Sequence, residues 1–131
     1  MTAIVLDACA GVEIALQTPM GRHLQAKIPA GSTTWVPEHY FAEATAVLRR
    51  DEMHQRHSAA KIQVALDRLL TSPVRRVSVR PLIPEAWRLR HNITIGDGIY
   101  VVMAQHLQAE LVTTDLKLAR SPTLPVSTIT P

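Results

Sequence analysis

Short apolar runs alternate along the chain with longer stretches whose apolar residues recur at helical spacing. The first run, AIVL at residues 3–6, has the β-branched composition of a strand that is buried on both faces. Similar runs, bounded by proline or polar residues, predict four further strands. These strands are expected at residues 33–36, 74–79, 110–114 and 125–129.

Helical patterns fill the segments between the predicted strands. Pro37 and Pro84 suit the first turns of two helices, and Ser58 is a favoured N-cap for a third. The predicted helices cover residues 8–16, 37–50, 58–70, 84–91 and 99–107, and a short helix is expected after Asp115.

Strands that alternate with helices predict an α/β fold. We expect a single domain over residues 1–131, with a mostly parallel central sheet and helices on both faces. A chain of 131 residues suits one domain, and its 47% hydrophobic and 19% charged residues exclude a disordered or fibrous class. In sheets of this kind, binding sites gather beyond the carboxyl ends of the strands.

Neither a membrane span nor a secretory signal is expected. The longest apolar run, residues 99–104, is far shorter than the roughly 18 residues of a membrane helix. The apolar start of the chain lacks a basic leader and contains Asp7 and Glu13, which argues against a signal peptide. Because Cys9 is the only cysteine, no internal disulfide can form. We therefore expect a cytoplasmic protein.

The net charge of +3 conceals a basic middle between two acidic flanks. Residues 49–90 hold ten Lys and Arg against four acids, whereas the rest of the chain holds four bases against seven acids. A basic segment can attract a polyanion through phosphate contacts and counterion release. A solvated helical face explains the same charges, and both interpretations stay open.

Four carboxylates stand at positions that suit chemistry. Asp7 and Asp115 lie where a predicted strand gives way to a helix, so both can face the expected crevice. Glu43 lies on a predicted core-facing stripe, and Asp97 stands between two glycines at the start of an apolar helix. Each acid also has a structural explanation. The aspartates can be helix N-caps, and Glu43 can be a boundary residue paired with an arginine.

The four acids together indicate more than each acid alone. Carboxylates packed into one pocket repel one another, and some would take up protons. A hard divalent cation removes this conflict, since Mg²⁺ prefers oxygen ligands and commonly keeps waters and substrate phosphates. Such an ion can activate water and stabilise charge on a scissile phosphate.

Three segments carry a resemblance to a known family. IVLDACAGVEIAL, PEHYFAEATAVLRR and GDGIYVVMAQHLQAELVTTDLKLA together resemble the PIN-domain ribonucleases, and most closely the VapC-type toxins of toxin–antitoxin systems. The resemblance implies endonucleolytic hydrolysis of RNA with Mg²⁺, for which Mn²⁺ can substitute. It also implies a cognate antitoxin and a homodimer. By the same resemblance, the catalytic and metal-binding acids are Asp7, Glu43, Asp97 and Asp115, with the Thr113 hydroxyl beside them.

The basic middle is then expected to bind the RNA substrate. The candidates for phosphate contacts are Arg49, Arg50, Arg75 and Arg76. Two positions depart from the family pattern. Cys9, a weak donor, stands where Ser or Thr commonly orients the first carboxylate, and Gly98 stands where Ala is common.

Other functions remain as alternatives. A structure-specific DNA nuclease shares the same metal chemistry, and a PIN-like fold can serve as an inactive RNA-binding or regulatory module, although the retained acids count against that. Phosphatases of the haloacid-dehalogenase type would need an Asp in place of Cys9. No glycine-rich nucleotide loop occurs.

The remaining conspicuous residues are assigned structural roles. His54 and His57 are expected to be solvated or to face RNA rather than to bind a metal. Cys9 is expected to be a small buried thiol. Trp35 and Trp87 are expected in the core or at an interface rather than as platforms for base stacking.

Overall fold

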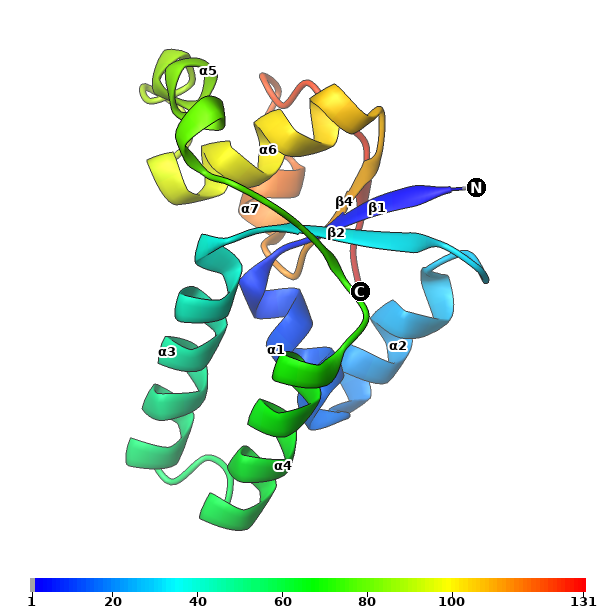
Figure 1. Ribbon diagram of the computed structural model, residues 1–131, viewed down its shortest axis with the longest axis vertical. Helices are drawn as coiled ribbons and strands as arrows, with labels where there is room; N and C mark the ends of the chain where they lie inside the picture. Colours follow the sequence, from blue (N-terminus) through cyan, green and yellow to red (C-terminus); the bar gives the residue numbers. More distant parts are fainter. Residues whose placement is uncertain (1) are drawn as a thin grey trace.

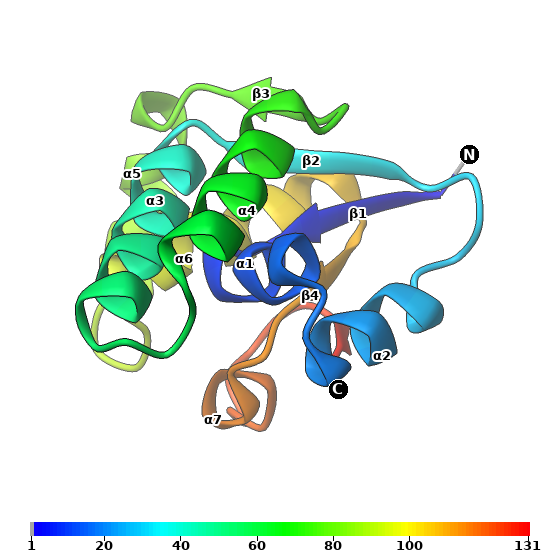
Figure 2. The same ribbon diagram turned by 90° about the horizontal axis from the view of Figure 1, so that it is seen from below.

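Five strands form a central sheet in the computed structural model, which describes residues 2–131 (Figures 1 and 2). Every neighbouring pair of strands is parallel, in the order β3-β2-β1-β4-β5. The strands are β1 Ala3–Leu6, β2 Thr33–Pro37, β3 Arg75–Val77, β4 Glu110–Val112 and β5 Thr128–Ile129. Because β1 is the central strand, its carboxyl end lies between those of β2 and β4.

Helices cover both faces of the sheet, as the alternating pattern predicts (Figure 1). The helices are α1 Ala8–Leu16, α2 Pro19–Lys27, α3 His39–Met53, α4 Ala59–Thr71, a 3₁₀ turn at Arg80–Leu82, α5 Ile83–Arg88, α6 Ile95–Leu107 and α7 Leu116–Ala119. On one face α1 packs against α2, α3 and α4, and on the other α6 packs against α5 and the strands. No helix of the described residues is long and apolar enough to cross a membrane.

Two glycines allow the helices on the α1 face to approach closely. A Cβ atom at Gly11 would lie 2.2 Å from Tyr40 Oη, so the backbone of α1 packs directly on the buried tyrosine of α3. A Cβ atom at Gly21 would lie 2.0 Å from the backbone oxygen of Glu13. This contact lets α2 fold back tightly against α1. The arrangement leaves the other end of α1, next to the sheet edge, free to present side chains.

Several predicted elements are confirmed with their boundaries nearly unchanged. The strand at Ala3–Leu6 and the helix at Ala8–Leu16 have the predicted bounds. Ser58 caps α4 as expected, because its Oγ accepts a hydrogen bond of 3.2 Å from the Lys61 N–H. The apolar α6 is also present, and the residues from Gly98 to Ala104 are all buried.

One prediction of local structure is wrong, and one helix was not predicted. Pro37 does not open a helix. It ends β2, paired with Val77 of β3, and α3 starts at His39 and runs to Met53. The helix α2 was not predicted, because its sequence PMGRHLQAK has few apolar residues. Its start signal was nevertheless present, since Thr18 Oγ1 accepts from the Gly21 N–H at 3.0 Å with proline at the first turn.

Candidate active site

The carboxyl ends of β1 and β4 place two of the predicted acids next to each other. Asp7 follows β1 directly and caps α1, with its Oδ1 accepting from the Ala10 N–H at 2.8 Å. Asp115 follows β4 and caps α7, accepting from the Leu118 N–H at 3.0 Å. Because the two strands are parallel neighbours, with Leu6 beside Val112, both acids lie at the same end of the sheet, where the strands have their carboxyl ends.

Thr113 connects these two acids. Its side chain is completely buried and hydrogen-bonds to the carboxylate of Asp7. The same hydroxyl oxygen accepts a bond of 3.0 Å from the Asp115 N–H. The predicted position of Thr113 beside the acids is therefore the observed one, and one hydroxyl holds both strand ends in a fixed relation.

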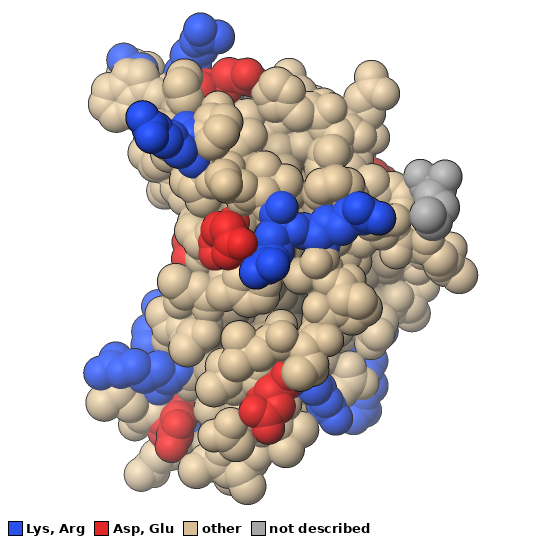
Figure 3. Space-filling model, in the orientation of Figure 1, with Lys and Arg blue, Asp and Glu red and all other residues tan. Residues whose placement is uncertain are grey.

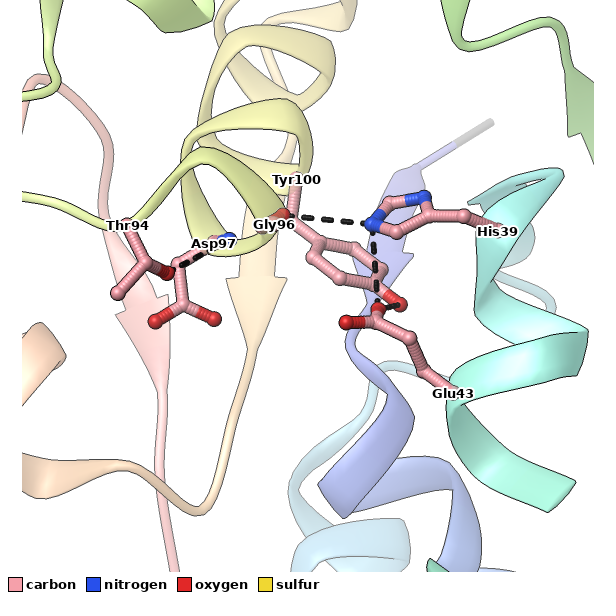
Figure 4. Close-up of polar contacts among 6 residues, drawn as sticks. All are labelled: His39, Glu43, Thr94, Gly96, Asp97 and Tyr100. Carbon is pink, nitrogen blue, oxygen red and sulfur yellow. Dashed lines mark hydrogen bonds and ion pairs between the residues drawn. The ribbon is translucent and has the colours of Figure 1, made fainter. Parts of the chain in front are cut away.

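Glu43 reaches the same edge from α3, held by two neighbours (Figure 4). Its Oε1 accepts a hydrogen bond of 2.7 Å from Tyr100 Oη of α6 and lies 3.1 Å from His39 Nε2, one helical turn earlier. His39 and Tyr100 also stack, with ring centroids 4.8 Å apart. The expectation that Glu43 lies on a core-facing stripe is wrong, because its side chain is 41% exposed and lines a cleft.

Asp97 lies in the first turn of α6 but does not cap it. Thr94 is the N-cap, and its Oγ1 accepts from the Asp97 N–H at 3.2 Å (Figure 4). The alternative explanation of Asp97 as an N-cap is therefore wrong, since the helix begins at Ile95, earlier than predicted. Its carboxylate has no capping role and is available to the cleft.

A cleft of about 410 Å³ brings together acids from three separate segments. Asp7, Glu43 and Asp97 line it, with Arg49 and Arg50 of α3 at its border. A second cleft, of about 470 Å³, is also lined by Asp97 and includes Asp115, the N-cap of α7. Asp97 is thus shared by the two clefts, and all four predicted acids line one or the other.

The electrostatics of the site show unneutralised negative charge. The pKa of Asp7 is raised to about 6, chiefly by burial and also by the charges of Asp97 and Asp115, against the lowering effect of the hydrogen bonds from Thr113 and Ala10. Burial also raises the pKa of Asp97, with Asp115 and Glu43 acting in the same direction. The carboxylates therefore destabilise one another, and a cation would relieve them.

The four predicted acids are ligands of the kind that a hard divalent ion prefers. Their side chains are all carboxylates, and Mg²⁺ is commonly held by one or two of them together with waters and substrate phosphates. Among the described residues, however, no group of three or more His, Cys, Asp or Glu side chains lies where it could hold a metal ion by itself. An ion here would therefore depend on waters or substrate oxygens for part of its coordination.

The four arginines predicted to bind RNA fall into two groups. Arg49 and Arg50 line the first cleft. Arg75 and Arg76 lie on the edge strand β3, where Arg75 stacks 5.5 Å over the ring of Trp35 and Arg76 lies 3.6 Å from Glu38. Figure 3 shows Lys and Arg side chains in separate groups on this face rather than in one continuous patch.

Burial corrects one expectation and narrows another. Cys9 is exposed and lines the first cleft rather than the core, because its neighbours Ala8 and Ala10 occupy the buried side of α1. The pKa of its thiol is raised by partial burial and by the charge of Asp7. Trp87 is 55% exposed on the short α5, with Arg90 4.4 Å over its ring, so it is not in the core and its expected place at an interface stays a prediction. Trp35 is partly buried against the core, as expected.

Four residues of the site escaped the sequence analysis. His39 and Tyr100 hold Glu43, and Lys117 and Arg120 line the second cleft. His39 precedes Glu43 by four residues, a helical spacing that was a usable signal. Lys117 and Arg120 belong to an acidic flank of the chain, so the net charge of that segment gave no indication of them.

Comparison with known proteins agrees with this geometry. The PIN-domain family model matches residues 4–123. Ribonuclease VapC12 of Mycobacterium tuberculosis is 36% identical over 118 residues, which cover 90% of this chain and 91% of the relative.

Solved structures share the fold. The crystal structure of VapBC2 from Rickettsia felis, bound to a DNA fragment from its promoter, has a TM-score of 0.65 at 17% identity, covering 97% of this chain and 98% of that chain. A toxin–antitoxin complex from Klebsiella pneumoniae has a TM-score of 0.63 at 15% identity, covering 91% and 92%. The chain therefore belongs to the PIN-domain family and, within it, to the VapC ribonucleases.

Proposed function

We propose that this protein is a Mg²⁺-dependent endoribonuclease that hydrolyses RNA phosphodiester bonds, and that Mn²⁺ can substitute. The observation that carries the proposal is the convergence of four carboxylates at one sheet edge, with Asp7 buried and its pKa raised to about 6. A fold does not normally gather uncompensated charge in this way unless a bound cation relieves it. The identity to a curated ribonuclease supports RNA as the substrate.

The ion would be held by carboxylates of Asp7, Glu43, Asp97 and Asp115. Bound there, Mg²⁺ supplies an activated water and offsets the charge that develops on the scissile phosphate. The chain's own part is to hold these ligands in place. Thr113 fixes Asp7 relative to Asp115, and Tyr100 and His39 fix Oε1 of Glu43.

Arg49 and Arg50 contribute to substrate binding rather than to the chemistry. They border the cleft that contains three of the acids. Their positive charges offset the repulsion between these acids and the phosphates of an incoming strand. They attract RNA of any sequence, because phosphate contacts position a strand without reading its bases.

Incubation of the purified protein with total RNA tests this function. Cleavage is expected with Mg²⁺ or Mn²⁺ and should stop when EDTA is added. Single-stranded and duplex DNA of matched length serve as parallel substrates. Cleavage of DNA but not RNA would favour the structure-specific DNA nuclease. RNA binding without cleavage under every metal condition would favour the inactive RNA-binding module.

We also propose that a cognate antitoxin holds the enzyme inactive and that the protein is a homodimer. Support comes from membership of the VapC group and from exposed apolar side chains on and beside α4, which are Met53 at 64%, Val64 at 49% and Leu70 at 61% exposure. Expression alone should arrest growth, and co-expression with the product of an adjacent small reading frame should restore it. Light scattering of the purified chain should give twice the mass of one protomer.

The RNA target is best identified by sequencing RNA ends after brief induction. A selective toxin should produce new ends at one or a few sites in tRNA, rRNA or mRNA. Random fragmentation would contradict target selection while leaving the chemistry intact.

A further inference from the structure

We propose that the second cleft, beside α7, is a binding site for the RNA strand where it continues past the carboxylates, and that Lys117 and Arg120 contact its phosphates. This inference rests on the proposed ribonuclease function and adds to it a second half of the substrate path. It assigns a role to two basic residues that lie outside the basic middle of the chain.

The second cleft is continuous with the carboxylates of the site. It is about 470 Å³ and is lined by Asp97 and Asp115 together with Lys117 and Arg120. Asp97 also lines the first cleft, with Arg49 and Arg50. One carboxylate is therefore shared by two clefts that each carry a pair of basic residues. A strand that passes Asp97 and enters both clefts would meet both pairs.

The two basic side chains of the second cleft, Lys117 and Arg120, are free to bind a ligand. Lys117 and Arg120 are exposed, and within residues 2–131 neither side chain has a hydrogen bond or an ion pair. Arg75 and Arg76 differ in this respect, since Arg75 stacks on Trp35 and Arg76 lies beside Glu38. Binding a phosphate at α7 therefore displaces no existing ion pair.

The mixture of acids and bases in the two clefts favours a polyanion over a single phosphate. Asp97 and Asp115, which line the cleft, repel any anion, so a single phosphate would bind there only weakly without cations around it. A polyanion that spans both clefts meets four basic side chains at once, and the release of counterions from several phosphates gives the affinity. Asn92 and Ser121 also line the second cleft and offer an amide and a hydroxyl to a sugar or a base edge. A single RNA strand of several nucleotides fits these requirements.

The test is the salt dependence of RNA binding. A 5′-fluorescein-labelled 20-nucleotide single-stranded RNA is titrated with the full chain in EDTA, so that cleavage is prevented, at several salt concentrations. The double variant Lys117→Gln/Arg120→Gln should bind about tenfold more weakly at 100 mM salt, and the slope of log K against log salt should fall by about 1.4, near 0.7 for each lost phosphate contact on a single strand.

Two further variants control for charge and for folding. The matched control is Arg22→Gln/Lys27→Gln, which removes the same charge from exposed positions on α2 that lie outside the basic middle and line neither cleft. It should leave the slope unchanged. The exchange Lys117→Arg/Arg120→Lys keeps the charge and should keep the wild-type slope. An unchanged slope in the Gln variant, or an equal fall in the control, would overturn the inference.

A parallel cleavage assay separates this inference from the proposed function. With Mg²⁺, the Gln variant should show a raised KM for long RNA and a nearly unchanged kcat. If the wild type cleaves RNA while the Gln variant keeps both its slope and its KM, the second cleft is not part of the path and the ribonuclease stands. If the salt slope of the Gln variant falls as expected while the wild type never cleaves RNA, the binding site is supported and the proposed ribonuclease function is contradicted.

Discussion

The two acids at strand ends and the two acids on helices reach the cleft by different means. Asp7 and Asp115 each cap the helix that follows their strand, and Thr113 hydrogen-bonds with both segments. Glu43 and Asp97 cap nothing, and Glu43 depends on a tyrosine from the facing helix. The strand-end acids are thus fixed by backbone geometry, whereas the helical acids are fixed only when α3 and α6 have packed.

Burial does not follow the same division. Asp7 is 7% exposed, whereas Asp115 is exposed and the side chain of Glu43 is 41% exposed. Desolvation therefore acts most strongly on Asp7, which carries the pKa raised to about 6. The comparison implies that changes at Asp7 and at its buried neighbour Thr113 alter both stability and catalysis, whereas changes around Glu43 alter mainly catalysis.

The largest expected effect is loss of cleavage in Asp7→Asn. Asn is similar to Asp as an N-cap, so α1 should remain capped while a charge needed for metal binding is removed. RNA cleavage should fall by at least about 100-fold, the upper end of the effect of residues that merely support a metal ligand. Asp67→Asn on the exposed side of α4 is the matched control and should cleave at the wild-type rate. If Asp7→Asn keeps its cleavage activity, and Mg²⁺ raises the melting temperature of the variant as much as that of the wild type, then Asp7 serves only as an N-cap.

Removal of the shared hydroxyl tests how far the strand ends act as one unit. Thr113→Val keeps the shape of a fully buried side chain but leaves the Asp115 N–H without its acceptor. That hydrogen bond is part-buried and Asp115 is exposed, so water can partly replace the lost acceptor, and the free energy of unfolding should fall by about 1 kcal/mol in urea denaturation. Thr45→Val on the exposed face of α3 provides the comparison and should change stability much less. Equal effects of the two substitutions would show that Thr113 holds nothing together.

The stability of Asp7→Asn relative to wild type should depend on pH. The pKa of Asp7 is about 6 in the folded state and 3.8 in the unfolded reference, so folding favours its protonated form. That contribution is fully present below pH 3.8 and is lost as the pH rises through 6. Without metal, the stability advantage of Asp7→Asn should therefore grow by about 1.5 kcal/mol between pH 5 and pH 8. A difference that stays constant across this range would contradict the raised pKa.

A smaller effect, confined to catalysis, is expected when the support of Glu43 is weakened. Tyr100→Phe removes the bond of 2.7 Å to Oε1 but leaves the ring in place. Cleavage should fall by about tenfold, the lower end for residues that orient a metal ligand, and the midpoint of a Mn²⁺ titration should rise. The melting temperature should change little, because Glu43 keeps access to water. Tyr40→Phe is the paired control on α3, and an equal loss of activity there would remove the special role of Tyr100.

The smallest expected effect concerns the departure from the family pattern at Gly98. A Cβ atom there would lie 3.4 Å from Ala86 Cβ, at the border of ordinary contact. Because glycine in a helix costs about 1 kcal/mol relative to alanine, Gly98→Ala should stabilise the protein by about 0.5 kcal/mol. Cleavage should be unchanged, since Gly98 contributes no side chain to the cleft. A loss of stability would mean that α5 and α6 cannot separate by the few tenths of an ångström required.

Helices and strands that are encoded by local propensity and capping residues could be predicted from the sequence. The β-branched run at residues 3–6, the Ser58 cap and the apolar α6 were all readable, because propensity and capping depend on neighbours within a few residues. The order of strands and helices was enough for the α/β class. The family pattern added the four acids. By contrast, α2 was missed because a polar helix has little apolar periodicity.

The contacts between site residues that are distant in sequence depend on tertiary packing and could not be predicted from the sequence. Glu43 lies 57 positions from Tyr100 in the chain, and the bond between them exists because α3 and α6 approach the same sheet edge. Lys117 and Arg120 belong to an acidic stretch by sequence yet flank the carboxylates in space, whereas Arg75 and Arg76 belong to the basic middle yet lie on an edge strand. Charge acts through distance in space, and the distance between such residues is set by packing, not by separation along the chain.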